Sequence, residues 1–126
     1  MTNGREKGAV GERELADLLV SHGMMARRTV QYCGKTGEAS DLKVDGLLVH
    51  VECKRVERIR LSEWVDQATN DARGRHWAIF TRQSRRPWLV IQTLDDWIRD
   101  SKAAEAAIEH RKAVVTRAAE EAWNVE

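Results

Sequence analysis

The chain has few cysteines, little net charge and no long apolar run, and each shortage excludes a class of protein. Its two cysteines, Cys33 and Cys53, show no C-x-x-C or Cys/His spacing typical of a zinc site. No signal-peptide core or membrane-length segment is present, which predicts no membrane partner and a cytoplasmic location in a bacterial, archaeal or phage-infected host cell. Because the net charge is only +1, the molecule as a whole is not an obvious polyanion binder.

What remains is the composition of an ordinary globular domain. Charged residues make up 33% of the 126 residues and hydrophobic ones 42%. This length gives room for a real core. We therefore expect one domain over residues 1–126, with a core over about residues 5–98 and a helical extension over about residues 101–123.

Hydrophobic periodicity and turn signals predict the order helix, strand, hairpin, helix, strand, strand, helix, helix. This order is typical of an α/β fold with a central mixed sheet covered by helices. The expected elements are helix 8–22, strand 24–30, hairpin 40–54, helix 62–73 capped by Ser62, strands 76–81 and 88–91, a helix capped by Thr93, and a helix from 101 to about 123.

Residues 40–54 form the most informative stretch. Asp45-Gly46 favours a two-residue type I′ turn, which pairs Leu42 with Val49 and Asp41 with His50. Side chains alternate between the faces of a strand, so one face is apolar and the other carries most of the polar groups. The first face holds Leu42, Val44, Leu47, Val49, Val51 and Cys53, and the second holds Asp41, Lys43, Leu48, His50, Glu52 and Lys54.

The second face brings two carboxylates, Asp41 and Glu52, close to the ammonium of Lys54. Two neighbouring carboxylates repel unless one takes a proton or a cation lies between them. Mg²⁺ meets that need with carboxylates, waters and substrate phosphates. A solvated salt-bridge cluster on an exposed sheet is the structural alternative.

A third acid lies on the first helix. Glu12 extends backwards the inward stripe of Leu15, Ala16, Leu19 and His22. A carboxylate on an apolar face is costly unless something pairs with it, although acids in a first helical turn also interact favourably with the helix dipole. On the helix over 62–73, Gln67 borders the apolar stripe, so it either reaches the sheet or merely lies at the border.

Glu12, Asp41 and Glu52-Cys53-Lys54, in this order of elements, resemble the PD-(D/E)xK nuclease superfamily, with Ser40 in place of the proline. Residues 7–13, Lys-Gly-Ala-Val-Gly-Glu-Arg, resemble the start of archaeal-type Holliday-junction resolvases, and residues 85–90 resemble phage-encoded resolvases. The resemblance covers about residues 5–98 and implies a restriction-endonuclease-like core with an extra C-terminal helix.

The resemblance also implies roles for these residues. Asp41 and Glu52, helped by the Cys53 carbonyl and Glu12, would bind one or two Mg²⁺ ions, for which Mn²⁺ substitutes. Lys54 would orient the hydrolytic water, and Gln67 would hold that water or Lys54. The implied catalytic residues are Glu12, Asp41, Glu52, Lys54 and Gln67, and the implied metal ligands are Glu12, Asp41, Glu52 and Cys53.

The implied activity is Mg²⁺-dependent resolution of Holliday junctions by paired symmetric nicks, in recombination or repair, with branched double-stranded DNA as the partner. Two symmetric nicks require two sites related by a two-fold axis, which predicts a homodimer. Residues 32–39 are the loop expected to probe the junction. Candidate phosphate contacts are Arg5, Lys7, Arg13, Lys35, Arg55, Arg58, Arg82, Arg85 and Arg86.

Two alternatives stay open. One is a restriction- or repair-type endonuclease of the same superfamily that acts on duplex or flap DNA. The other is a non-catalytic DNA-binding module. Candidates for the dimer interface are Trp64, Trp88, Trp97 and the C-terminal helix, with core packing as the alternative for each tryptophan. We favour core packing for Trp77 and Trp97.

Overall fold

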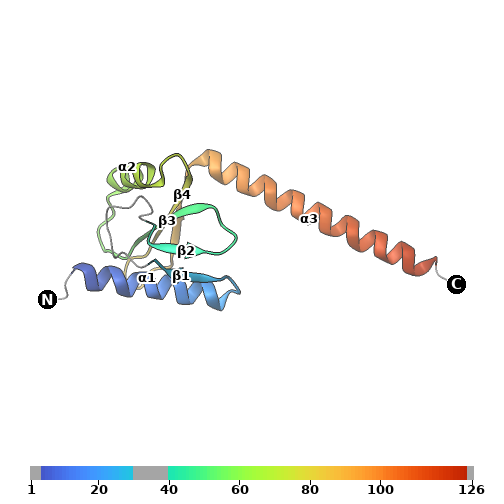
Figure 1. Cartoon of the computed structure of the whole chain (residues 1–126), viewed down its shortest axis with the longest axis horizontal. Coiled ribbons are helices and arrows are strands. Elements are labelled where there is room, and N and C mark those ends of the chain that lie inside the picture. Colours follow the sequence, from blue (N-terminus) through green and yellow to red (C-terminus); the bar gives the residue numbers. More distant parts are fainter. Residues whose placement is uncertain (1–3, 30–39, 125–126) are drawn as a thin grey trace. The chain divides into compact units, whose positions relative to one another are not determined.

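The computed structural model describes residues 4–29 and 40–124, so the expected loop over 32–39, with Lys35, lies outside the described residues. The chain divides into two compact units, residues 1–92 and 93–126, which are described separately below. The elements (Figure 1) are α1 (Gly4–Ser21), β1 (Ala26–Arg28), β2 (Leu42–Val44), β3 (Val49–Lys54), α2 (Leu61–Ala72), β4 (His76–Thr81), β5 (Leu89–Ile91) and α3 (Leu94–Trp123).

The first unit is built on a five-stranded mixed sheet with the strand order β1-β2-β3-β4-β5. β3 and β4 are parallel, and the other neighbouring strands are antiparallel. Parallel neighbours cannot be joined by a tight turn, and here α2 makes the crossover. The predicted α/β fold with a central mixed sheet and a C-terminal helix is therefore confirmed.

One face of the sheet is covered by α1. Leu15 and Ala16 pack on Leu42 of β2 and Val51 of β3 in one hydrophobic cluster. Leu15, Leu42 and Val51 are each only 1% exposed. The inward stripe predicted for the first helix is thus the one that packs on the sheet, and Glu12, one turn earlier, lies on the same side of the helix.

The other face is covered by α2, so that the sheet lies between the two helices (Figure 1). Trp64, Ala68 and Ala72 pack on Trp77 and Ile79 of β4. Trp77 is 7% exposed, which confirms its predicted place in the core. Trp64 is 6% exposed and part of the same core, so it does not supply interface surface.

The predicted hairpin register was wrong by two residues. Leu42 pairs with Val51 rather than with Val49, and a four-residue connection replaces the two-residue turn. In that connection Gly46 alone has positive φ, +83°, whereas a type I′ turn needs positive φ at both central residues. Leu47 is consequently 46% exposed rather than in the core. Because a shift of two preserves the alternation of side chains between the two faces, Asp41 and Glu52 still belong to the same face of the sheet, as predicted.

Helix boundaries also differ from expectation. α1 begins at Gly4, four residues before the predicted start at Gly8. Ser62 is not the N-cap of α2: Arg60 occupies that position and makes no side-chain capping bond. The predicted cap of α3 is confirmed, because the Thr93 side chain accepts a hydrogen bond from the backbone N–H of Asp96.

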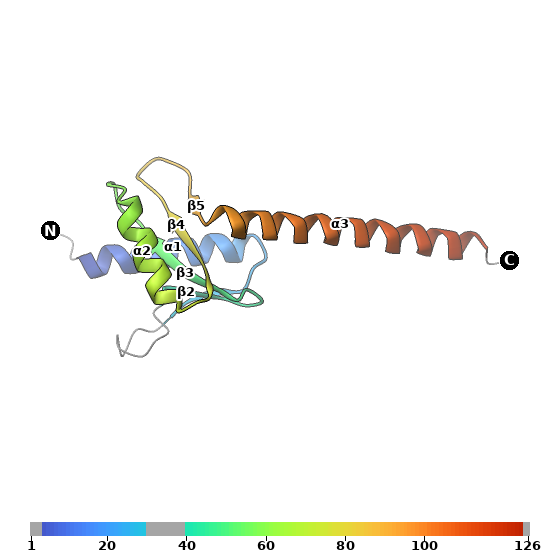
Figure 2. The same ribbon diagram turned by 90° about the horizontal axis from the view of Figure 1, so that it is seen from above.

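The second unit is one continuous helix rather than the two predicted (Figure 2). Nothing between Ile98 and Ser101 breaks a helix, since Arg99 and Asp100 carry no Gly or Pro penalty. Trp97 is 57% exposed, so its predicted core position was wrong. No helix in the part of the chain that the structure describes is long and apolar enough to cross a membrane.

Candidate functional site

Asp41 lies where β2 begins, close to each of the other two acids predicted from the sequence, Glu52 and Glu12. Ser40 fixes this point, because its Oγ accepts a hydrogen bond from the Val51 N–H at 2.8 Å and donates one to the Leu42 carbonyl at 2.9 Å. The next backbone N–H, that of Asp41, donates to the Val51 carbonyl at 2.8 Å. Serine thus ties the two strands with its hydroxyl, which proline at this position lacks.

The Asp41 carboxylate is held against β3. Its Oδ2 accepts a hydrogen bond from the backbone N–H of Cys53 at 2.8 Å. In a strand, the N–H and C=O of one residue point to the same neighbour. The Cys53 carbonyl therefore lies on the same side of β3 as Asp41.

The surroundings of Asp41 disfavour its ionised form. Burial raises the pKa of Asp41 from 3.8 to about 7, and the negative charges of Glu52 and Glu12 add to the rise. A hydrogen bond between the side chains of Asp41 and Glu52 acts in the same direction, while the Cys53 N–H opposes it. Glu52 and Glu12 are therefore close enough to Asp41 to disfavour its ionisation, which is the arrangement that a proton or a cation relieves.

Glu12 has a partner that the sequence analysis missed. Its side chain is 14% exposed, and its Oε2 lies 2.8 Å from Nε of Arg28 on β1. The arginine offsets part of the cost of placing this acid on an apolar stripe. Arg28 is one residue of a basic pair, and only the pairing of β1 with β2 brings it to the acids.

Glu52 is buried on the other side of the sheet plane, under α2. It is 3% exposed and His50 is completely buried, so this polar face is not the exposed sheet considered as an alternative. His50 Nε2 lies 2.7 Å from Glu52 Oε1. Asp71 of α2 joins them, with one potential ligand atom from each of the three residues within 4.8 Å of the others.

The sequence analysis gave no role to His50 or Asp71, although the signals were present. His50 precedes Glu52 by two residues on the same strand face, and Asp71 follows Gln67 by one helical turn. What was missing was the knowledge that α2 lies over that face.

The predicted lysine and glutamine are in contact. Lys54 Nζ donates a hydrogen bond to Gln67 Oε1 at 2.8 Å. The backbone of Lys54 is fixed as well, because its carbonyl accepts bonds from Thr81 Oγ1 at 2.8 Å and from the Arg82 N–H at 3.2 Å. Of the two roles considered for Gln67, the geometry favours holding the lysine.

Cys53 presents its backbone, not its sulfur, to the acids. Its side chain packs in the cluster under α1. Burial, followed by the charges of Asp41 and Glu12, raises the pKa of the Cys53 thiol to about 12. A protonated, partly buried thiol is not a ligand for a hard cation, so only the carbonyl remains a candidate.

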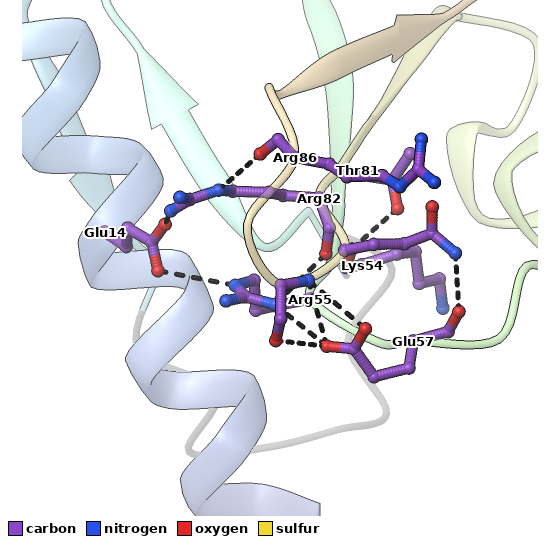
Figure 3. A network of polar contacts seen from close by, with 9 residues as sticks. Glu14, Lys54, Arg55, Glu57, Thr81, Arg82 and Arg86 are labelled. Atoms are coloured by element: carbon purple, nitrogen blue, oxygen red, sulfur yellow. Dashed lines mark hydrogen bonds and ion pairs between the residues drawn. The ribbon is translucent and has the colours of Figure 1, made fainter.

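Two of the arginines predicted to bind DNA instead form ion pairs within the protein (Figure 3). Arg55 Nε lies 3.5 Å from a carboxylate oxygen of Glu14 on α1, and the Arg82 guanidinium also contacts that carboxylate. Arg55 further lies 3.6 Å from Glu57. These ion pairs tie α1 to the segments that follow β3 and β4.

Most of the other arginines predicted to contact DNA lie on the surface. Four are exposed and form no ion pair with any residue that the structure describes: Arg13, Arg58, Arg85 and Arg86. Arg5 and Lys7 belong to α1, but their side chains are not described, and Lys35 lies outside the described residues.

The comparisons with known proteins bear on the fold. No family model matches the sequence, and no curated protein sequence matches it. The solved structure of Archaeoglobus fulgidus Hjc, a Holliday junction resolvase from an archaeal hyperthermophile, is similar with a TM-score of 0.53 and 22% identity. The match covers 68% of this chain and 76% of that one. The chain therefore shares the fold of this resolvase.

Proposed function

We propose that this protein is a metal-dependent endonuclease that hydrolyses phosphodiester bonds in branched DNA and resolves four-way junctions. The observation that carries the proposal is the burial of Asp41 close to both Glu52 and Glu12, together with a lysine two residues after Glu52 whose ammonium is held by Gln67. The resolvase fold of the sheet and its two helices adds support.

The donor set suits a hard divalent cation. Asp41, Glu52 and the Cys53 carbonyl offer oxygen atoms, Glu12 adds a third carboxylate, and the Cys53 sulfur is turned away. Mg²⁺ prefers oxygen ligands of this kind, and Mn²⁺ should substitute. When bound, the cation would polarise the scissile phosphate and lower the pKa of a coordinated water.

The chain's own groups would do the rest. The Lys54 ammonium, kept extended by Gln67, can orient the attacking water and stabilise the charge that grows on the phosphate oxygens. The carboxylates of Asp41 and Glu52 would hold the cation on one side of the reacting phosphate. Loss of the Gln67 bond would leave the lysine several rotamers to explore, which reduces the fraction of productive encounters.

Contacts between arginine side chains and the phosphates of the DNA backbone would provide the affinity for DNA. The exposed residues Arg13, Arg58, Arg85 and Arg86 are the candidates, whereas Arg55 and Arg82 act as internal ties. Phosphate contacts position a duplex without reading its sequence, which suits recognition of DNA shape. A two-fold symmetric junction cut on two strands calls for a homodimer.

The decisive experiment compares a synthetic four-way junction with a linear duplex and a flap of matched sequence, with Mg²⁺ or with EDTA. The proposal expects paired symmetric nicks in the junction only, and none in EDTA. Cleavage of the duplex or flap at equal rates would support a restriction- or repair-type enzyme. Binding without cleavage of any substrate would support a non-catalytic module.

Variants test the assigned residues. Glu52→Ala and Lys54→Ala should abolish Mg²⁺-dependent cleavage while leaving junction binding largely intact. Gln67→Ala should lower kcat by about tenfold to a hundredfold with little change in KM. Lys43→Ala, an exposed lysine on β2, is the matched control and should leave cleavage unchanged. Full activity in Lys54→Ala would remove the proposed site.

Salt dependence tests the surface arginines. The double variant Arg85→Ala with Arg86→Ala should weaken junction binding and flatten the slope of log affinity against log salt by about 1.8, which is about 0.9 per lost phosphate contact. An unchanged slope would exclude both residues from the interface. Sedimentation equilibrium tests the dimer, and a purely monomeric protein that still makes paired nicks would refute it.

A further inference from the structure

His50 is the one completely buried titratable side chain on the face of β3 that carries Glu52 and Lys54. A histidine in a sheet core needs hydrogen-bond partners, because an unpaired polar group away from water is costly. In this protein the need is only half met. Nε2 lies 2.7 Å from Glu52 Oε1, whereas Nδ1 is the buried side-chain nitrogen without any hydrogen-bond partner among the described residues.

The direction of this hydrogen bond depends on the imidazole tautomer. The tautomer that carries its proton on Nε2 donates to the Glu52 carboxylate oxygen, which is an acceptor. On the side of Asp41, Glu52 shares a further side-chain hydrogen bond. The Glu52 carboxylate is therefore held between His50 under α2 and Asp41 at the start of β2.

We propose that His50 is a positioning residue, which fixes the Glu52 carboxylate in the orientation needed to bind the divalent cation. The proposal rests on the function proposed above. Groups that hydrogen-bond a ligating carboxylate orient it, and their loss costs about tenfold to a hundredfold in metal affinity or activity. The unpaired Nδ1 makes this histidine a costly choice for core packing alone, because an apolar side chain of similar size would leave no polar atom unpaired.

Asp71 provides the rival interpretation. Its carboxylate, His50 and Glu52 place one potential ligand atom each within 4.8 Å of one another, so the trio could itself hold a cation with His50 as a ligand. The two interpretations differ in what they require. Positioning needs an N–H donor near Glu52 and does not need Asp71, whereas ligation needs the imidazole and Asp71.

Three variants separate them. His50→Gln keeps an N–H donor at the same number of bonds from the backbone, and His50→Met fills similar volume without a donor. Asp71→Asn removes the third carboxylate and keeps its shape. If His50→Met does not fold, His50→Leu replaces it.

Two readouts are measured below each variant's unfolding transition: Mn²⁺ binding to the metal-free protein by electron paramagnetic resonance, and the Mg²⁺ concentration that half-saturates junction cleavage. We expect His50→Met to weaken both by about tenfold to a hundredfold, and His50→Gln and Asp71→Asn to stay within about threefold of the parent protein. Cleavage saturated with Mg²⁺ should recover in His50→Met, because the carboxylate is displaced but not removed.

Two results would overturn the positioning role. If His50→Met binds Mn²⁺ as the parent does, the hydrogen bond to Glu52 is only structural. If His50→Gln and Asp71→Asn lose as much affinity as His50→Met, His50 is a ligand. Failure of the proposed function looks different, because the parent protein would then show no Mg²⁺-dependent cleavage at all, whatever residue occupies position 50.

Discussion

Replacing Asp41 by asparagine should stabilise the metal-free protein above neutral pH, although it should abolish cleavage. The carboxylate of Asp41 is buried beside Glu52 and Glu12, and its pKa is raised from 3.8 to about 7. Asparagine keeps an oxygen that accepts the Cys53 N–H bond but carries no charge. The variant therefore removes the repulsion and retains the strand contact.

The sign of the effect follows from proton linkage. The folded state binds more protons than the unfolded state between pH 3.8 and about 7, so stability falls as the pH rises through this window. The loss is complete above the folded pKa. Each unit by which folding raises the pKa of Asp41 corresponds to about 1.4 kcal/mol of unfolding free energy. The rise from 3.8 to about 7 therefore sets an upper bound of about 4 kcal/mol on the stability lost at high pH. Because Asp41 and Glu52 titrate together, we expect about 2 to 4 kcal/mol to be recovered.

The assay is thermal or urea unfolding of both proteins in EDTA from about pH 4 to about pH 8. The two should be about equally stable at the acid end, and the variant should be more stable at the alkaline end, with a Tm higher by roughly 10 °C. Mg²⁺ should raise the Tm of the parent protein and not that of the variant. Asp45→Asn, an exposed carboxylate in the β2–β3 connection, controls for the loss of one charge.

A stability difference between Asp41→Asn and the parent that does not change with pH would refute the reasoning. So would a variant that is less stable than the parent above neutral pH. Either result would mean that Asp41 is not buried beside Glu52 and Glu12 in the folded protein, and the proposed cation site would lose its physical basis.

Two further predictions concern α1 and β3. Gly11→Ala should destabilise the protein by about 1 to 3 kcal/mol in urea unfolding, because a Cβ there would overlap the Arg55 Cβ. Gly8→Ala, on the same helix with open space around it, should instead stabilise by up to about 1 kcal/mol; equal effects would argue against the close approach of α1 to Arg55. In a Cys33→Ser background at about pH 8, the folded Cys53 thiol, with its pKa raised from 9.0 to about 12, should be alkylated about a thousandfold more slowly than in urea. A fast reaction of the folded protein would show that the thiol is not buried under α1.

The register of β2 against β3 illustrates how far local signals reach. Asp45-Gly46 correctly marks a reversal of the chain, yet the pairing moves by two residues and Leu47 leaves the core. The period of two that places Asp41 and Glu52 relative to the sheet survives, because the shift is even. β1 contributes to this outcome because it pairs with β2, and the Asp45 N–H donates a hydrogen bond to the carbonyl of Met25, the residue before β1. The turn propensity of Asp45-Gly46 could not predict this contact, because Met25 lies twenty residues earlier in the chain.

Periodicity and turn signals were enough to predict the order of elements as far as β5, the apolar stripe of α1, and the closeness of Asp41 to Glu52, because each depends on a repeat of two or 3.6 residues within one or two neighbouring segments. Only the tertiary structure shows which side chains the charged residues contact. Strand pairing brings Arg28 to Glu12, and the packing of α2 on the sheet brings Asp71 to His50 and Glu52. Arg55 and Arg82 form ion pairs with Glu14. A charged side chain's partner depends on which elements pack over it, and periodicity along one segment carries no information about its neighbours.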